Sequence, residues 1–433
     1  MKKNIFLTPF QKFIKTESFA GALLFGATLI ALLWANSSYA DIYHRIWQTE
    51  LGFKIGNFSL YKPLILWIND GLMAIFFFVI GLELKRELLV GEINSLKKAA
   101  FPVVAALGGI IVPILFYLSL NSRPETLSGW GIPMATDIAF ALAILSLLGN
   151  KVPLSLKVFL TAFAIIDDLA AVSVIALFYT DNLNVILLAG GLVLILLLAL
   201  FYRYKKYHPL PGIITGIIVW FLFLKAGIHP TIAGVLLAFT IPIKRRMNIV
   251  DFSYQMHEIA DKLVEETNQS CGLLTNEERK RLEQMKNLMR EVESPLQSLE
   301  QKLHTVVAYF ILPLFAFSNA GVKLSMEAHY DYNLIKNIAI SLFAGKFLGV
   351  LIFSYLGLKL KLTVLPETMN FKHIIGISAL AGVGFTMSIF IANLAFKGEP
   401  FLIDSSKIGI IIGSFLAGLS GYLILNFAGK QKV

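Results

Sequence analysis

The chain has 433 residues, of which 56% are hydrophobic and 15% are charged, and its formal net charge is +10. A soluble domain is typically about 45–50% apolar and about 25% charged, so this composition excludes an ordinary soluble enzyme, a disordered protein and a disulfide scaffold. The single cysteine, Cys271, excludes an internal disulfide and a cysteine-based metal cluster.

Apolar runs long enough to cross a membrane recur along the whole chain. Because about 20 helical residues span the hydrocarbon core, we predict an all-α polytopic membrane protein with about twelve transmembrane helices. The expected spans are residues 14–36, 63–84, 98–120, 126–149, 152–179, 182–203, 208–225, 228–243, 304–322, 333–358, 372–396 and 405–427. The first run precedes Ser38-Tyr39-Ala40, which resembles a signal-peptide cleavage site, but its length favours a retained helix.

An even number of spans places both termini on one side of the membrane. The segments on that side carry twice as many Lys and Arg residues as the opposite segments. Cytoplasmic loops are enriched in these residues, so we expect both termini in the cytoplasm and a bacterial inner (plasma) membrane location. The basic net charge therefore needs no nucleic-acid partner.

Two short alternating runs flank Gly56-Asn57 between the first two spans. This pattern favours a two-residue β-turn, so residues 51–61 are predicted to form a small periplasmic β-hairpin. An isolated hairpin is marginally stable in water, and pairing with the hairpin of a second copy would supply a partner.

Residues 244–303 differ sharply in composition, with nearly equal numbers of acidic and basic residues. The stretch Asn276–Gln301 has the apolar spacing of a surface helix, and Thr275 is a suitable N-cap with Glu278 three residues later. We expect a single membrane domain over residues 1–433, in which 244–303 is a cytoplasmic helical insertion between helices 8 and 9. The simplest interpretation is that residues 244–303 form a solvent-exposed helical segment without a specific role. A regulatory role for this segment is the alternative.

A few ionisable residues lie near the midpoints of apolar spans, namely Asp137, Asp167, Asp168 and Lys346. Such residues are costly in a membrane and indicate a functional site. Asp167 and Asp168 are adjacent, and two neighbouring carboxylates cannot both remain ionised and dry. They must therefore face water, a cation or protons. A site that holds either a cation or protons, but not both, couples their movements in opposite directions.

Lys346 lies between small residues in Ala344-Gly345-Lys346, which permit close helix approach. An unpaired lysine at this depth would lose its proton or pair with a carboxylate, so we expect an ion pair with an aspartate. A purely structural ion pair and a lysine that releases a proton remain alternatives.

Two spans are predicted to be interrupted. Gly131, Pro133 and Asp137 fall within seven residues of the fourth span, and Gly382 and Gly384 lie in the eleventh. Unwound backbone at membrane depth is tolerated only where it lines a cavity or is buried in protein. Each break occurs in the middle helix of a three-helix group, as in transporters built from inverted repeats. Asp137 can balance the positive helix ends at the breaks and Lys346 the negative ones.

Several motifs together resemble the NhaA family of sodium/proton antiporters, over nearly the whole chain. They are Gly81-Leu82-Glu83-Leu84-Lys85-Arg86-Glu87-Leu88, Pro133-Met134-Ala135-Thr136-Asp137, Ile166-Asp167-Asp168-Leu169, Leu312-Pro313-Leu314-Phe315-Ala316-Phe317, Asn319-Ala320-Gly321, Gly345-Lys346 and Gly384-Phe385-Thr386-Met387-Ser388. The resemblance implies two discontinuous crossing helices and electrogenic, pH-regulated exchange of internal Na⁺ or Li⁺ for external protons. The protein would be a transporter, not an enzyme, with no cofactor and no catalytic residues.

The resemblance also implies roles for individual residues. Asp167 and Asp168 would bind Na⁺ or Li⁺ and protons, Lys346 would bridge to Asp167, and Thr136 and Asp137 would be the crossing-helix residues. The candidates for the pH response are Glu83, Arg86, Glu87, Glu300 and His304. Gln301 occupies a position where the family often has histidine. The hairpin 51–61 would make the protein a homodimer.

Three alternatives are weaker. An intramembrane aspartyl protease also needs two membrane carboxylates, but on separate helices, whereas Asp167 and Asp168 are adjacent. A sodium-coupled symporter of similar fold would need an organic-substrate pocket, for which the sequence has no clear polar cluster. A non-transporting scaffold leaves the membrane aspartates unexplained.

Overall fold

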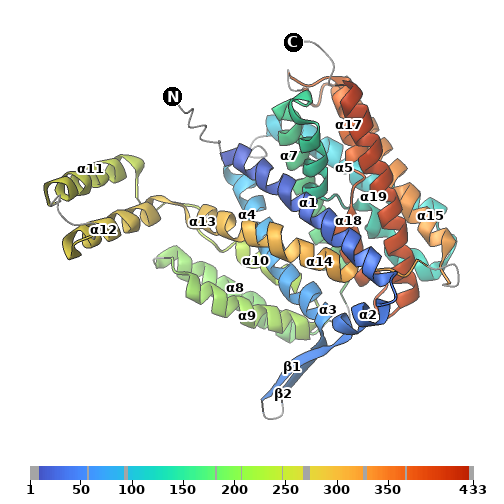
Figure 1. Cartoon of the computed structure of the whole chain (residues 1–433), viewed down its shortest axis with the longest axis horizontal. Coiled ribbons are helices and arrows are strands. Elements are labelled where there is room, and N and C mark those ends of the chain that lie inside the picture. Colours follow the sequence, from blue (N-terminus) through green and yellow to red (C-terminus); the bar gives the residue numbers. More distant parts are fainter. Residues whose placement is uncertain are drawn as a thin grey trace.

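A computed structural model describes residues 9–55, 58–91, 96–180, 183–205, 207–245, 247–266, 274–324, 329–365 and 368–428. The first described helix begins and the last described helix ends on the same side of the molecule, and a β-hairpin lies on the opposite side (Figure 1). We call these sides the terminal face and the hairpin face.

The first half of the chain is almost entirely helical. Its elements are α1 (Pro9–Ala35), α2 (Ala40–Gln48), β1 (Glu50–Ile55), β2 (Phe58–Pro63), α3 (Leu64–Leu66), η1 (Trp67–Leu72), α4 (Met73–Val90), α5 (Leu96–Leu120), η2 (Pro124–Met134), α6 (Ile138–Leu147), η3 (Gly149–Lys151), α7 (Leu154–Phe178), α8 (Val185–Tyr204) and α9 (Pro209–Ala226).

The second half continues in the same way. Its elements are α10 (Thr231–Ala238), α11 (Ile249–Glu266), α12 (Asn276–Val292), α13 (Pro295–Val306), η4 (Val307–Ile311), α14 (Leu312–Asn319), α15 (Tyr332–Ile340), η5 (Ser341–Gly345), α16 (Lys346–Lys359), α17 (Phe371–Leu380), α18 (Phe385–Ala395) and α19 (Pro400–Ala428). Segments η1, η4 and η5 are π-helical, and η2 and η3 are 3₁₀-helical.

Many of these helices are suited to a membrane. Among the described residues, eight are long and apolar enough to cross it, or up to ten if each of two bent pairs counts as one span. The bent pairs are η2 with α6 and α17 with α18. The span expected at 228–243 is a helix of only eight residues, α10. Pro242 limits this helix, because proline has no N–H to donate to the carbonyl oxygen of Ala238 four residues earlier.

The predicted hairpin is present between α2 and α3. Strand β1 pairs antiparallel with β2, with Ile55 opposite Phe58 as the innermost pair. The turn residues Gly56 and Asn57 lie outside the described residues. The two strands extend beyond the helical body (Figure 1), so their outer edges have no partner within the described chain.

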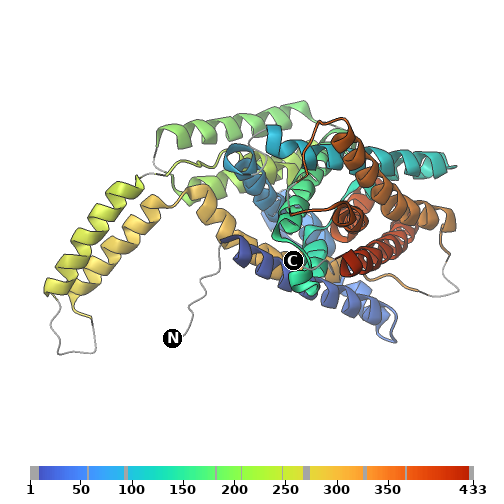
Figure 2. The ribbon, with the colours of Figure 1, turned by 90° about the horizontal axis from the view of Figure 1, so that it is seen from above.

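Helices α11 and α12 pack against each other and project away from the membrane helices (Figure 2). Thr275 and Glu278 form the predicted capping box at the start of α12. The prediction of one helix over Asn276–Gln301 is wrong, because α12 ends at Val292 and α13 begins at Pro295. Pro295 explains the break, since Ser294 before it is extended.

Close helix approach in the body depends on glycine. At the crossing of α5 and α16, a Cβ atom on Gly349 would overlap the carbonyl oxygen of Gly108. This crossing brings Lys346, at the start of α16, beside the helices that carry the aspartates.

Candidate functional site

Helix α7 places both predicted aspartates inside the protein. Asp167 is fully buried and Asp168 is 4% exposed. Adjacent helical residues diverge by about 100°, so the two carboxylates leave α7 in different directions. Each therefore meets a different set of neighbours.

Asp167 is held by a cation and a hydroxyl. Lys346 forms an ion pair with the Oδ2 atom of Asp167, and the Thr136 hydroxyl donates to the same oxygen at 2.6 Å. The side chains of Asp167 and Lys346 are both fully buried. A buried pair of this kind is stabilised by close geometry and further hydrogen bonds. Thr136 donates one to Oδ2 of Asp167 and Met134 accepts one from Lys346, whereas the buried Oδ1 of Asp167 has no hydrogen-bond partner among the described residues.

Asp168 faces a cavity. The cavity has a volume of about 550 Å³, including space open to solvent, and its lining includes Asp168, Thr136 and Asp137. The lining continues to Glu83 and His304 near the terminal face. Within the described chain, buried oxygen Oδ1 of Asp168 has no hydrogen-bond partner. An unsatisfied carboxylate oxygen beside a cavity fits a site for a hard cation or a proton.

The two predicted breaks are present and lie against each other. One falls at residues 135–137 between η2 and α6, and the other at 381–384 between α17 and α18. The backbone N–H of Asp137 donates to the carbonyl oxygen of Val383 at 2.6 Å, which joins the two breaks directly.

Asp137 caps the N-termini of two half-helices. Its Oδ1 accepts from the N–H of Phe140 in α6 at 3.2 Å. Its Oδ2 accepts from both the N–H and the hydroxyl of Thr386 in α18, at 3.1 and 2.6 Å. Because free N–H groups make a helix N-terminus positive, the carboxylate is stabilised there.

The opposite helix ends receive donors. Lys346 donates to the carbonyl oxygen of Met134, the last residue of η2. The hydroxyl oxygen of Thr136 also lies 2.9 Å from the carbonyl oxygen of Ala381 after α17, so its one proton can serve either that oxygen or Asp167. The structure thus brings Thr136, Asp137 and Lys346 together with Asp167 around the two breaks.

A second group of charges lies between this site and the terminal face. His304 contacts Glu17 at 2.9 Å and Glu83 at 3.3 Å. Sequence reasoning missed Glu17, although it lies within the first expected span. The rule that a membrane carboxylate indicates function would have found it.

The remaining pH-response candidates lie beside this group. Arg86 pairs with Glu300 at 3.0 Å and with Glu87 at 2.6 Å. Glu300 lies in α13, four residues before the start of the expected span 304–322. Burial raises the pKa of Glu300 to about 7, although Arg86 lowers it. Glu300 therefore changes charge near neutral pH.

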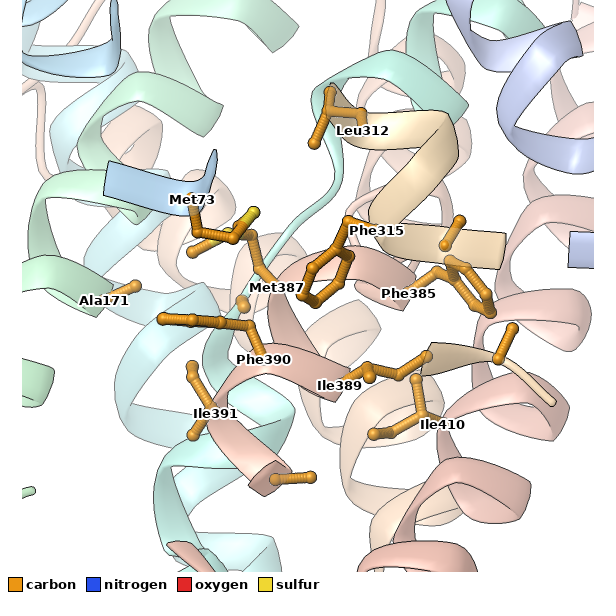
Figure 3. Close-up of a cluster of buried hydrophobic side chains, with 14 of the residues drawn as sticks. Met73, Ala171, Leu312, Phe315, Phe385, Met387, Ile389, Phe390, Ile391 and Ile410 are labelled. Carbon is orange, nitrogen blue, oxygen red and sulfur yellow. The ribbon is translucent and has the colours of Figure 1, made fainter. Parts of the chain in front are cut away.

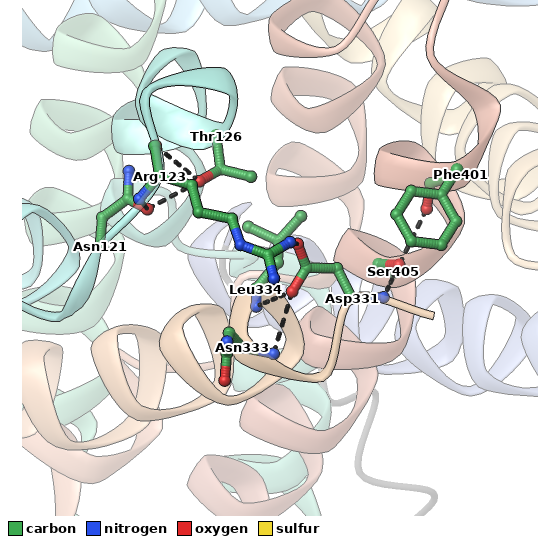
Figure 4. A network of polar contacts seen from close by, with 8 residues as sticks. All are labelled: Asn121, Arg123, Thr126, Asp331, Asn333, Leu334, Phe401 and Ser405. Atoms are coloured by element: carbon green, nitrogen blue, oxygen red, sulfur yellow. Dashed lines mark hydrogen bonds and ion pairs between the residues drawn. The ribbon is translucent and has the colours of Figure 1, made fainter. Parts of the chain in front are cut away.

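Two polar networks on the hairpin face were not predicted. In one, Arg123 pairs with Asp331 at 2.9 Å, and Asp331 caps α15 by accepting from the N–H of Asn333 (Figure 4). In the other, Asp70 pairs with Lys62 at 2.7 Å and lies 3.7 Å from His229. Neither network reaches the aspartates on α7. Arg123 and Asp331 are far apart in the sequence, whereas Lys62 and Asp70 lie close together in β2 and η1.

No group of three or more His, Cys, Asp or Glu side chains that could hold a metal ion occurs within the described ranges.

Comparisons with known proteins identify the family of the chain. The family model described as Na+/H+ antiporter 1 matches residues 11–425. The chain is 45% identical to the Na(+)/H(+) antiporter NhaA 1 of Saccharophagus degradans, over 100% of this chain and 94% of the relative. It is 42% identical to the Na(+)/H(+) antiporter NhaA of Parabacteroides distasonis and 43% identical to that of Helicobacter acinonychis, each over 99% of this chain and 98% of the relative.

Proposed function

Because the chain belongs to the Na+/H+ antiporter 1 family, we propose that it exchanges cytoplasmic Na⁺ or Li⁺ for external protons. The proposal rests chiefly on Asp168, whose buried and unsatisfied oxygen faces a cavity beside the Asp167–Lys346 pair. A carboxylate there binds either a cation or a proton, and this competition is the basis of exchange.

The proposed mechanism uses the contacts of Asp167. An arriving Na⁺ takes carboxylate oxygens from Asp168 and Asp167, which weakens the hold of Asp167 on Lys346. Lys346 can then release a proton, because an ammonium group without a carboxylate partner is not stable in an apolar interior. Protons arriving from the other side reverse these steps and displace the cation. The two carboxylates titrate as one coupled pair.

The proposal is tested with everted membrane vesicles that hold a pH gradient reported by a dye. Adding Na⁺ or Li⁺ should collapse the gradient in vesicles that contain the protein and not in vesicles without it. Vesicles that keep their gradient after both cations, on either side of neutral pH, would rule out the exchange.

We propose that the exchange is electrogenic. Two carboxylates and a lysine at the site can each hold a proton, whereas Na⁺ brings one charge, so more than one proton can replace each cation. In proteoliposomes, dissipating the membrane potential with valinomycin and K⁺ should then accelerate exchange. The relatives are named as Na(+)/H(+) antiporters, so the alternative of a sodium-coupled symporter is not favoured.

For the membrane architecture we propose a single domain of twelve spans, counting α10 and the helix formed by η4 and α14. Inverted repeats are supported by two three-span groups, each with a bent middle span, of 47° in η2–α6 and 42° in α17–α18. The excess of Lys and Arg on the terminal face supports cytoplasmic termini in an inner membrane. The residues 244–303 then form a cytoplasmic insertion, and the exchange needs no cofactor.

We propose that the cluster of Glu17, Glu83, Arg86, Glu300 and His304 regulates exchange by pH. These groups lie in and beside the cavity that leads to Asp168, so their charge sets the electrostatic potential along the cation path. Since the pKa of Glu300 is about 7, its carboxyl is mostly protonated at about pH 6 and mostly ionised at about pH 8. Rising pH therefore adds negative charge near the entrance and favours cation entry.

Replacing Glu300 with glutamine should flatten the pH dependence. The amide cannot ionise, so the rise in exchange rate between about pH 6 and about pH 8 should be smaller than in the native protein. The measurement is the initial rate of Na⁺-driven exchange across this pH range. Glu293→Gln, an exposed position on the same insertion, is the matched control. An unchanged pH profile in Glu300→Gln would exclude this carboxyl as a pH-response group.

We further propose that the hairpin joins two copies into a homodimer. Strands β1 and β2 pair only with each other among the described residues, and unpaired strand edges readily pair with another chain. Ile55 and Phe58 form the pair closest to the turn, and their backbone groups face each other. Because inward-facing and outward-facing pairs alternate along an antiparallel hairpin, the backbone N–H groups of the next pair, Lys54 and Ser59, point outward, one on each edge.

Replacing both Lys54 and Ser59 with proline should therefore convert the dimer to a monomer. Proline removes one outward donor from each edge and leaves the pairs within the hairpin intact. Molecular mass in detergent, measured by light scattering after size-exclusion chromatography, reports the result. The control is the double replacement by alanine, which keeps both donors. If the proline variant remains dimeric, edge pairing does not hold the copies together.

A further inference from the structure

Three helical segments that line the cavity continue from it toward the hairpin face. Phe76 of α4, Leu312 of α14 and Met387 of α18 line the cavity that contains Asp168. One turn further toward the hairpin face, these helices contribute Met73, Phe315 and Phe390, which are buried in one apolar cluster (Figure 3). Within this layer, Phe390 packs against Phe315 with ring centroids 6.2 Å apart.

One turn beyond the apolar layer, each of the three helical segments carries an asparagine. These are Asn69 in η1, Asn319 at the end of α14 and Asn393 in α18. Each asparagine is three or four residues from the apolar-layer residue of the same helical segment. The cavity-lining residue, the apolar residue and the asparagine therefore lie on one face of each segment. About 9 Å of α18 separates Met387 at the cavity from Asn393.

The three asparagines bond to one another across the helices. The side-chain amide of Asn69 donates to Oδ1 of Asn319 at 3.2 Å, and that of Asn319 donates back to Oδ1 of Asn69 at 2.9 Å. Asn393 donates to Oδ1 of Asn319 at 2.9 Å. Asn319 is fully buried and Asn69 is 7% exposed. We call these three residues the amide cluster.

The amide cluster joins α18, which is half of a broken span, to η1 and α14, which are not part of the broken spans. Helix α18 is bonded to Asp137 through Thr386, so it belongs with the broken spans around the aspartates. Asn69 precedes α4, which packs mainly on α10, and Asn319 ends α14, which packs mainly on α1. The bond between Asn393 and Asn319 therefore crosses the boundary along which the cavity lies.

Neutral amides suit a contact that must both close and open. When the route is closed, buried amides are costly unless all of them are paired, and here they pair with one another. When water enters, it replaces those hydrogen bonds at little net cost. Charged groups would make the closed state costly, and apolar groups would make the open state costly. We propose that the amide cluster is a latch that keeps the hairpin side of the cation route closed while the site is open to the terminal face.

This latch rests on the proposed function, because only a transporter needs the route to open on both sides in turn. Its test uses labelling of a cysteine and does not depend on transport. A reporter, Leu312→Cys, is placed in the cavity of a chain in which Cys271 is replaced by serine. A membrane-impermeant methanethiosulfonate is then applied to everted and to right-side-out vesicles.

The reporter should react quickly from the terminal side and slowly from the hairpin side. Adding Asn393→Ala should raise the rate of labelling from the hairpin side two- to tenfold, which corresponds to the loss of one hydrogen bond. Asn337→Ala is the matched control. Asn337 is buried and donates to the carbonyl oxygen of Tyr117 at 3.0 Å, away from the cation route, so its loss should leave the rate unchanged. Equal hairpin-side rates in Asn393→Ala and in the parent would overturn the proposal.

A second arm covers the case in which Asn393→Ala does not fold. Asn319→Cys and Asn393→Cys are bridged by a short bifunctional methanethiosulfonate, which fixes the closed state. Exchange should stop and should return on reduction, whereas continued exchange in the bridged protein would also overturn the latch. Failure of the unbridged parent to exchange Na⁺ for protons would count against the proposed function alone, because the labelling rates still report on the latch.

Discussion

Replacing Asp168 with asparagine is expected to reduce cation-driven collapse of the pH gradient to the level of vesicles without the protein. The side chain keeps its size, but it loses the negative charge that a buried cation requires and the capacity to take up a proton. Both halves of the exchange use the same oxygen atoms, so no compensating route remains. The effect should persist at high Na⁺ concentration, because the missing group is also the proton acceptor.

The control for Asp168→Asn is Asp251→Asn. Asp251 lies exposed at the start of α11, on the insertion that projects from the membrane helices. It should exchange at the native rate. Amounts of protein in the vesicles are compared by immunoblot, so that loss of exchange is not confused with loss of protein. Substantial Na⁺-driven exchange in Asp168→Asn would remove Asp168 from the mechanism.

Replacing Lys346 with alanine should destabilise the protein by about 3–5 kcal/mol, because it leaves the fully buried carboxylate of Asp167 without its cation. It also removes the donor to the carbonyl oxygen of Met134 at the end of η2. Thermal unfolding in detergent, followed by tryptophan fluorescence, measures the effect.

The double variant Lys346→Ala with Asp167→Asn should recover part of the loss. The neutral amide no longer needs a cation, so the two substitutions should be strongly non-additive, as expected for groups in direct contact. Additive losses would mean that the two side chains contribute to stability independently of each other. In exchange assays, unchanged charge movement per Na⁺ in an active Lys346→Ala variant would argue against lysine as a proton carrier.

Much of the site could be predicted because charge is rare in apolar spans. Asp137, Asp167, Asp168 and Lys346 were identified by that rule alone, and the structure places them together around the two breaks. The two breaks were also predictable, because glycine and proline weaken a helix and stand out within an apolar run of the sequence.

Other features leave no comparable signal in the sequence. Asn69 and Asn319 form hydrogen bonds although they are 250 residues apart. A neutral amide in an apolar helix can bond within its own helix or to another helix, and the sequence does not show which. Residues 244–303 were predicted to be a helical insertion, but the bounds of α11 within it were not predicted. Pro242 limits helix α10, and a hydropathy run does not reveal how early a helix ends.

The ion pair between Lys346 and Asp167 has a consequence for biosynthesis. The two residues are 179 positions apart, and at roughly 5–20 residues per second about 10–35 s separate their synthesis. Each aspartate at the centre of a spanning helix costs roughly 2.5–3.5 kcal/mol on insertion. The leucines, isoleucines and phenylalanines of α7 must therefore carry two aspartates into the bilayer before the lysine exists. The apolar length of α7 thus serves the newly made chain as well as the finished protein.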